Sequence, residues 1–198
     1  MKQIFEITDK KIINHVLDNA AFGTLALCKD NRPYALPINF VRVENKLYFH
    51  GSKKGKKIEI LQSNALASLS VVEAYSMIQS YFSSNDNLAC PATQFFKSVM
   101  IDGEITLIEA YDEKVLALQK LMEKLQSEGK YKPLHEEDYT KAIRATAIFR
   151  LDIKEISAKF KCGQHLDSER FNMIIEHLEE RAEVIDLATI ELMKSLKG

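Results

Sequence analysis

The sequence predicts a mainly β protein with flanking helices (α+β), in which short antiparallel strands form a sandwich or barrel. Two neighbouring runs consist mainly of apolar, β-branched and aromatic residues, and they are Tyr34 to Val41 and Leu47 to His50. Turn signals at Asp30-Asn31 and Glu44-Asn45 leave only short connections between the runs. Apolar stripes of helical period lie near the N-terminus and dominate the C-terminal end.

Composition sets the outer limits of size and class. The chain has 198 residues and 46% hydrophobic residues, which suits one domain, or one domain with a helical appendage, and excludes global disorder. With 27 basic and 28 acidic residues the net charge is −1, so no global attraction to nucleic acid is expected and a nucleic-acid partner is disfavoured. Any anion site must therefore be local.

Cysteine usage and hydropathy predict a soluble, cytoplasmic protein. Cys28, Cys90 and Cys162 are far apart and form no Cys-x-x-Cys pair, so neither a disulfide framework nor a structural zinc site is expected. Cys162 and His165 have ligand-like spacing, but one pair cannot make a metal site, and we predict none. No run approaches the roughly 18 apolar residues of a membrane span.

The first half of the chain reads as a helix followed by a meander. Residues 8–19 predict a helix capped by Thr8 or Asp9, and residues 23–28 predict a strand. The strand after Pro33 places Leu36, Ile38 and Phe40 on one face and Ala35, Pro37 and Asn39 on the other. Pro37 cannot donate to a ladder, so it marks an edge strand or a bulge.

The middle of the chain is less regular. Residues 58–61 predict a helix and residues 65–73 a buried strand. Residues 74–95 show no clear period and are interpreted as a lid over a site. Residues 96–109 return to strand character, with Gly103 as a bulge or turn.

The remaining elements are a third helix, further strands and a helical end. Asp112 is expected to cap a helix that Gly129 ends, with residues 130–143 as a loop with some helix and residues 146–161 as one or two strands. Two apolar stripes then predict C-terminal helices. Their members are Phe171, Ile174, Ile175 and Leu178, and then Ile185, Ala188, Leu192 and Leu196.

The turn from Gly51 to Lys57 is the most informative local feature. A strand ends in Gly51-Ser52, four lysines follow within five residues, and a helix begins. Helix N-terminal N–H groups, a serine hydroxyl and ammonium groups together are suited to hold a phosphate. Taken alone, such a charge run is more often a solvated face. The segment lacks the Ser or Thr after Lys and one residue of spacing that a P-loop needs, so hydrolysis of a nucleoside triphosphate is rejected.

Three segments in order resemble the FMN-binding split-barrel flavoproteins related to pyridoxamine 5′-phosphate oxidase, and most of all the 5-nitroimidazole-resistance (Nim) type. They are Gly23 to Leu27 with Arg32 to Phe40, Leu47 to Ser52 with Gly55-Lys56-Lys57, and Phe96 to Val99 with Gly103. The resemblance covers roughly residues 8–125, and the stretch Lys159 to Gln164 is also similar to one in related flavin-binding regulators.

The resemblance implies an antiparallel split β-barrel over residues 1–161, with residues 162–198 as a C-terminal helical extension packed on the same domain. It implies a homodimer that holds FMN at the subunit interface. The residues it places at the cofactor are Pro37, Ile38, Asn39, Phe40, His50, Gly51, Ser52, Lys56, Lys57, Lys97, Ser98 and Val99. The phosphate of FMN carries about two negative charges, which Lys56 and Lys57 could neutralise while Ser52 donates a hydrogen bond.

The leading hypothesis is an FMN-dependent oxidoreductase that reduces a small flat acceptor such as a nitroaromatic compound, with NADH or NADPH as a possible electron donor. His50 is the candidate catalytic residue, as a source of protons, and Lys97 would favour the reduced ring. Two alternatives stay open. One is a flavin-binding regulator or sensor without turnover. The other is a haem-binding split-barrel protein with His50, His165 or His177 as axial ligand.

Overall fold

The structure is a computed structural model that describes residues 3–196. Within these residues the chain forms seven strands, of which β1 to β4 are consecutive and the later ones are separated by helices. In chain order the elements are η1 (Gln3–Phe5), α1 (Lys10–Asn19), β1 (Gly23–Lys29), β2 (Arg32–Ile38), β3 (Val41–Val43), β4 (Lys46–Gly51), α2 (Lys56–Leu61), β5 (Leu66–Ile78), η2 (Ser80–Phe82), β6 (Thr93–Ile108), α3 (Tyr111–Leu125), η3 (Glu137–Tyr139), α4 (Thr140–Ala145), β7 (Ala147–Lys161), α5 (Ser168–Arg181) and α6 (Val184–Ser195).

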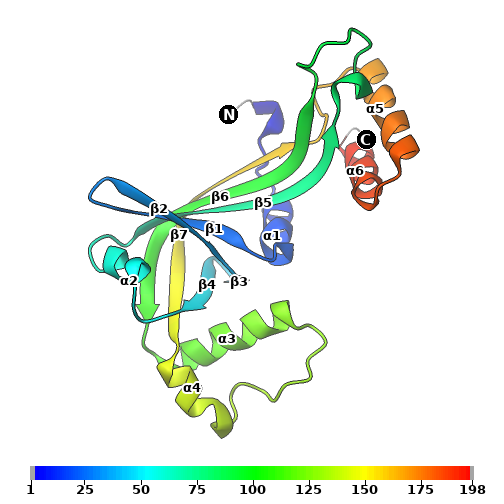
Figure 1. Cartoon of the computed structure of the whole chain (residues 1–198). Helices are drawn as coiled ribbons and strands as arrows, with labels where there is room; N and C mark the ends of the chain where they lie inside the picture. The colour runs from blue at the N-terminus through cyan, green and yellow to red at the C-terminus, as the bar shows by residue number, and fades with distance from the viewer. Residues whose placement is uncertain (1–2, 197–198) are drawn as a thin grey trace. The chain divides into compact units, whose positions relative to one another are not determined.

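The strands form one antiparallel sheet, drawn in Figure 1, in the order β2-β1-β5-β6-β7-β4-β3. β2 and β3 are the two edges, although only Asn39 and Phe40 separate them in the chain. A sheet whose sequence neighbours lie at opposite edges without pairing is a split barrel, so the predicted fold class is confirmed. Pro37 lies in β2, as expected for a residue that cannot donate to an inner ladder.

Two compact units make up the chain, and each is described by itself. The first comprises residues 1–13, 72–98 and 157–198, and the second comprises residues 14–71 and 99–156. The chain passes from one to the other within α1, β5, β6 and β7. The predicted division into residues 1–161 and 162–198 stays a prediction.

Alternation along the strands builds the core of the second unit. In β1, Leu25 and Leu27 are buried while Thr24, Ala26 and Cys28 are exposed. β2 follows the predicted faces, since Leu36 and Ile38 are more buried than Ala35, Pro37 and Asn39. One side of β4 and β7 is covered by α3. The buried residues of that cluster are Val41, Tyr48, Ile108, Ala117, Leu121 and Ile148.

Two predictions about β6 and α3 are wrong. Gly103 is not a turn, because β6 runs through it, and its bare α-carbon faces the backbone carbonyl of Asp152, while a bulge at this position stays a prediction. The glycine is therefore needed for close strand approach rather than for bending. Asp112 does not cap α3, since the N-cap is Ala110 and Asp112 lies in the first turn, where its charge complements the helix dipole.

In the first unit, residues 74–95 do not form an irregular lid. β5 continues to Ile78, η2 follows, and β6 begins at Thr93, so only residues 83–92 are irregular. The polar Ser76 hid the alternation of β5, because it points inward like the buried Ile78. Such burial is acceptable only when the hydroxyl is hydrogen-bonded.

Of the two C-terminal helices, α5 follows its prediction and α6 follows it only in part. Phe171, Ile174, Ile175 and Leu178 are buried, and Asp167 caps α5 by accepting from the Arg170 N–H at 2.9 Å. In α6 the buried face consists of Asp186, Thr189, Ile190 and Met193. Of the predicted stripe, Leu192 and Leu196 are partly buried against the core, whereas Ile185 is 39% exposed and Ala188 is exposed too.

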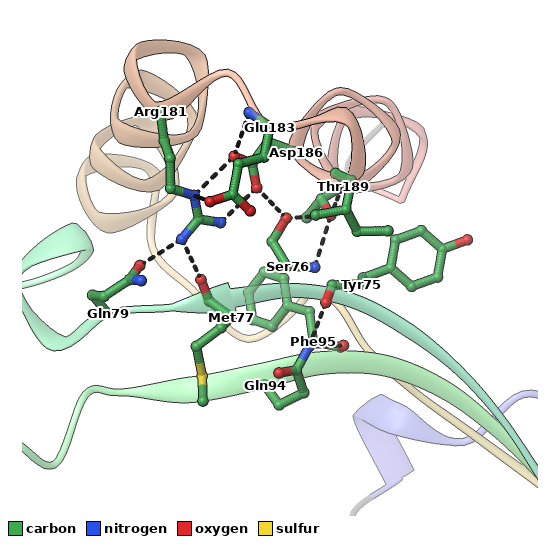
Figure 2. A network of polar contacts seen from close by, with 11 residues as sticks. Tyr75, Ser76, Met77, Gln79, Gln94, Phe95, Arg181, Glu183, Asp186 and Thr189 are labelled. Carbon is green, nitrogen blue, oxygen red and sulfur yellow. Dashed lines mark hydrogen bonds and ion pairs between the residues drawn. The ribbon is translucent and has the colours of Figure 1, made fainter.

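A buried polar network explains which face of α6 points inward (Figure 2). Asp186 is fully buried and pairs with Arg181 through Nε at 2.8 Å and Nη2 at 2.5 Å. Ser76 donates its hydroxyl to Asp186 at 2.5 Å, and its backbone N–H donates to Thr189 Oγ1 at 3.0 Å. Arg181 also donates to the Met77 carbonyl at 3.1 Å. Together these bonds join α5, α6 and β5 through one carboxylate.

Arg181 lowers the pKa of Asp186 to about 2, so the carboxylate is more acidic in the folded protein than in the unfolded chain. Its contribution to stability is complete above about pH 4 and is lost as the pH falls through about 2. We expect Asp186→Asn to lower the free energy of unfolding by about 1.5–3 kcal/mol at pH 7, because it replaces charge-assisted hydrogen bonds of the fully buried carboxylate and leaves Arg181 with only the more distant carboxylate of Glu183. The loss should shrink between about pH 4 and pH 2.

Urea unfolding followed by circular dichroism at a series of pH values measures this difference. Glu128→Gln, at an exposed position after the end of α3, is the control and should parallel the wild type. A loss in Asp186→Asn that stays constant down to pH 2 would contradict the assigned role of the Arg181–Asp186 pair.

Candidate functional site

The turn between β4 and α2 carries four lysines and is held by bonds that leave their charges free. The backbone N–H of Lys54 donates to Ser52 Oγ at 3.0 Å, which closes the turn locally. Lys53 Nζ donates to the carbonyl of Arg144 at 3.1 Å, which anchors the turn to the end of α4. Neither bond neutralises an ammonium group.

These lysines have no acidic partners. Among residues 3–196, no carboxylate lies within 4.0 Å of the ammonium group of Lys53, Lys54, Lys56 or Lys57. Aromatic rings lie near two of them instead: Lys56 Nζ is 4.5 Å from the centre of the Tyr34 ring. The turn is thus a local excess of positive charge in a nearly neutral chain, and it suits an anion.

Lys57 is the most constrained of the four. Its side chain is half-buried, with Nζ 3.9 Å from the centre of the Phe149 ring and 5.4 Å from that of Phe49. The two rings stack at 5.0 Å. Burial lowers the pKa of Lys57, because the desolvated ammonium has no counter-charge. The ammonium occupies the space that a β-carbon at Gly51 would need, which explains a glycine at the end of β4.

The contribution of the helix dipole is smaller than the sequence suggested. α2 has only six residues, and its N-cap Gly55 makes no side-chain cap and has φ of 100°. Glycine tolerates this backbone angle where other residues would be strained. The lysine charges therefore dominate the electrostatics of the turn.

A second group lies at the end of β2. Pro37, Ile38 and Asn39 line a pocket of about 300 Å³ together with Phe22, whose ring is 61% exposed. Asn39 Nδ2 donates to the carbonyl of Ala21 at 2.7 Å, which fixes the segment before β1 beside this strand end. Phe22 was not predicted as a site residue, and its only sequence signal is an aromatic residue directly before a strand.

Phe40 belongs to the core. Its ring is fully buried, and Lys124 Nζ lies 4.2 Å from the ring centre. The same ammonium donates to the carbonyls of Phe40 and Leu17 at 3.0 and 2.9 Å. Burial lowers the pKa of Lys124 to about 8. Any contact of Phe40 with a cofactor would therefore be through its backbone.

His50 is exposed, and the alternation of β4 sets its direction. Phe49 and Gly51 share the face that Lys57 contacts, while Tyr48 packs under α3. His50 follows the parity of Tyr48 and lies on the face opposite to the ammonium of Lys57. Its catalytic role stays a prediction.

The predicted residues of β6 have different settings. Val99 is fully buried in the second unit. Lys97, in the first unit, is 8% exposed and pairs with Glu73 Oε2 at 3.7 Å. Tyr75 donates to Glu73 Oε1 at 2.9 Å, and its ring centre is 4.9 Å from Lys97 Nζ. Unlike the lysines of the turn, Lys97 already has an anionic neighbour.

Ser98 and the tail that resembles flavin-binding regulators also lie in the first unit. Ser98 donates to the carbonyl of Lys159 at 3.5 Å. Cys162 is buried, which raises the pKa of its thiol to about 12 and keeps it protonated at neutral pH. His165 contacts the Phe5 ring edge-on. In the described part of the chain no three His, Cys, Asp or Glu side chains are grouped as metal ligands.

Comparison with known proteins shows the family. The family described as pyridoxamine 5′-phosphate oxidase matches residues 9–160, which is most of the chain, so the protein belongs to this family. A relative from Rhizobium meliloti (strain 1021), described as an uncharacterized protein, is 28% identical over 148 residues, 72% of this chain and 85% of that protein.

Solved structures share the fold. The flavocytochrome Anf3 of Azotobacter vinelandii is 25% identical, with a TM-score of 0.67, over 87% of this chain and 78% of that one. An FAD and haem binding protein of Mycobacterium smegmatis is 25% identical, with a TM-score of 0.65, over 82% and 76%. A candidate 5-nitroimidazole antibiotic resistance protein of Bacteroides thetaiotaomicron is 22% identical, with a TM-score of 0.65, over 78% and 85%, and supports the fold alone.

Hydropathy adds one observation. No helix within residues 3–196 has the length and apolar character needed to cross a bilayer.

Two buried or half-buried glycines give a contrasting pair for mutation. We expect Gly103→Ala to destabilise the protein by about 1–3 kcal/mol, because its methyl group meets the carbonyl of Asp152, which cannot move without the strand. Gly51→Ala should cost less than about 1 kcal/mol, because the group it meets is the flexible end of Lys57. Thermal and urea unfolding measure both, and equal losses would show that the Lys57 ammonium is held as rigidly as a backbone.

Proposed function

We propose that this protein binds a flavin through the turn between β4 and α2 and acts as a flavin-dependent oxidoreductase on a small flat acceptor. The observation that carries the proposal is the group of four lysines without acidic partners in the described chain, placed beside a glycine at a strand end. Unpaired charges cost stability, and a bound phosphate would offset that cost.

The charges match a flavin phosphate. At neutral pH a phosphate monoester carries about −1.5 to −2, so two ammonium groups suffice. Lys56 and Lys57 are the proposed pair, with Gly51 leaving room for the Lys57 ammonium and the Ser52 hydroxyl as a further donor. Each contact of this kind is charge-assisted and stronger than a neutral hydrogen bond.

The ring is proposed to lie along the end of β2. Pro37 and Ile38 offer apolar surface, Asn39 and the backbone of Phe40 offer polar groups, and Phe22 adds an exposed ring. Lys97, Ser98 and Val99 stay part of the proposed cofactor-binding set. When bound, a flavin supplies hydride and single-electron chemistry that no side chain provides.

Relatives support a flavin as cofactor. Two solved structures at 25% identity are described as a flavocytochrome and as an FAD and haem binding protein. FMN is the proposed form of the cofactor, because the Lys56 and Lys57 pair suffices for its single phosphate. A nitroaromatic acceptor, NADH or NADPH as donor and a cytoplasmic location complete the proposal.

A homodimer with FMN at the subunit interface is also proposed. In the second unit, Phe22, Leu66 and Met100 expose 61%, 60% and 40% of their surface. Contiguous exposed apolar patches are typical of surfaces that a partner covers. Phe22 lies beside the end of β2, where a second copy of the chain would cover it.

An absorption spectrum of the purified protein, before and after addition of FMN and NADH, tests the proposal. Flavin bands that bleach with NADH would support a reductase that uses this donor directly. Bound flavin that stays oxidised with every donor and acceptor tried would favour a regulator. Neither bound flavin nor affinity for added FMN would rule the proposal out.

The same spectrum tests haem binding, which the descriptions of both relatives at 25% identity favour as the second candidate. A Soret band would establish it. Of the histidines considered as ligands, His177 stacks on Phe82 at 4.7 Å between ring centres and pairs with Glu180 at 3.6 Å. A ligand role would require that pairing to break.

Replacement of both Lys56 and Lys57 by alanine should raise the Kd for FMN at least about 100-fold, because two charge-assisted contacts of roughly 1.5–3 kcal/mol each are lost. Quenching of FMN fluorescence measures the affinity. Lys141→Ala removes an exposed cation from α4 and is the control. Unchanged FMN affinity in the double variant would refute the phosphate site.

His50→Ala should reduce turnover more than flavin affinity if the imidazole delivers a proton. Steady-state rates and FMN titrations of the wild type and the variant separate the two effects. Parallel losses in turnover and affinity would indicate a structural role, and no loss in either would exclude His50 from the reaction.

A further inference from the structure

A small apolar pocket lies in the second unit between α2, β6 and β7. It has a volume of about 140 Å³ and belongs to none of the groups described so far. Its lining residues are Ile58, Leu61, Gln62, Ile105, Leu107 and Phe149. Whole ligand pockets measure roughly 300–1,000 Å³, so this volume suits one ring system of a larger ligand.

The walls of this pocket are apolar with a single polar group. Leu107 is 44% exposed at its rim, so the pocket is open to solvent. The exposed side chain of Gln62 is the polar member, and a carboxamide both donates and accepts hydrogen bonds. A flat heteroaromatic base with donors and acceptors on its edge fits apolar walls and one amide.

The pocket adjoins the lysines of the β4–α2 turn. Phe149 contributes to its wall and also lies 3.9 Å, from ring centre to Nζ, from Lys57. Ile58, the next residue after Lys57, lines the pocket too. A phosphate held by Lys57 would therefore stand beside a base seated in the pocket.

The charge of the turn exceeds the need of one phosphate. Four ammonium groups lack acidic partners in the described chain, whereas a phosphate monoester carries about two negative charges. Two phosphates, or one dinucleotide pyrophosphate, would match four cations better. The turn and the pocket together could therefore bind a larger part of a nucleotide than the single phosphate of FMN.

We infer that the pocket beside α2 binds the adenine base of an adenosine 5′-phosphate group, with its phosphate on the lysines of the turn. The inference rests on the proposed function, since it assigns a second part of the ligand to the same turn. The group could belong to FAD or to a nicotinamide dinucleotide that delivers electrons. The chemistry that the pocket recognises is the same in both.

The first experiment is a calorimetric titration of the flavin-free protein with 5′-AMP and with ribose 5-phosphate. We expect 5′-AMP to bind at least 10-fold more tightly, because only it carries the base. Leu107→Trp, which places a larger side chain at the rim, should abolish that preference. Leu116→Trp is the matched control, because Leu116 is 43% exposed on α3, outside the pocket lining.

Two further titrations identify the source of the group. An affinity for FAD at least 10-fold above that for FMN, lost in Leu107→Trp, would identify FAD. Equal affinities for FAD and FMN, with binding of NADH to the FMN-loaded protein that 5′-AMP competes away, would identify the electron donor. Either result supports the pocket.

Failure of this inference can be told apart from failure of the proposed function. If wild-type protein binds FMN but prefers 5′-AMP by less than 10-fold over ribose 5-phosphate, the pocket does not bind the base and the flavin proposal stands. An unchanged preference in Leu107→Trp would place the base elsewhere and overturn the inference. Absence of FMN binding to the wild type would overturn the proposed function itself.

Discussion

Strand alternation is the constraint on which the arrangement of this protein depends. Successive side chains point to opposite faces of the sheet. A shift of one residue in register therefore changes which side chains contact each other. In β4, Phe49 and Gly51 face the Lys57 ammonium, while Tyr48 is committed to the cluster under α3. The same rule exposes Pro37 and Asn39 at the end of β2. Proteins of this fold can thus present a charged turn and an apolar strand end without disturbing the core between them.

Much of the fold could be predicted because the strands and α5 follow simple periods. β1 and β2 alternate clearly, and the stripe of α5 is apolar at every buried position. The failures have a common cause, which is a polar residue or a glycine inside the core. Because Ser76 is polar, the second half of β5 was not predicted as a strand. Gly103 was predicted as a turn, and the polar Asp186 was not predicted on the buried face of α6. Ser76 and Gly103 contact Asp186 and Asp152 far away in sequence, and Asp186 also pairs with Arg181 in the preceding helix. Sequence periodicity contains no information about such partners.

The candidate site divides in a similar way. The lysine turn could be recognised from local sequence, since Gly51 to Lys57 is one continuous segment. Phe22 and the pocket that Gln62 and Leu107 share with Phe149 could not, because they depend on contacts between distant segments. Phe40 is a further case, because it lies in the segment assigned to the cofactor while its ring is part of the core. Adjacent residues of one motif can therefore have different roles.

The network around Asp186 has a consequence for how α6 is held. An apolar helix face can rotate or slide on an apolar surface at small cost, because dispersion contacts have little directionality. Hydrogen bonds from Ser76 and Arg181 converge on one carboxylate and fix the azimuth of the helix about its own axis. The chain accepts 89% exposure of Val184 and 59% of Leu187 to keep that setting. The buried polar groups therefore set the rotational orientation of α6. Apolar contacts alone would give several orientations nearly equal free energies.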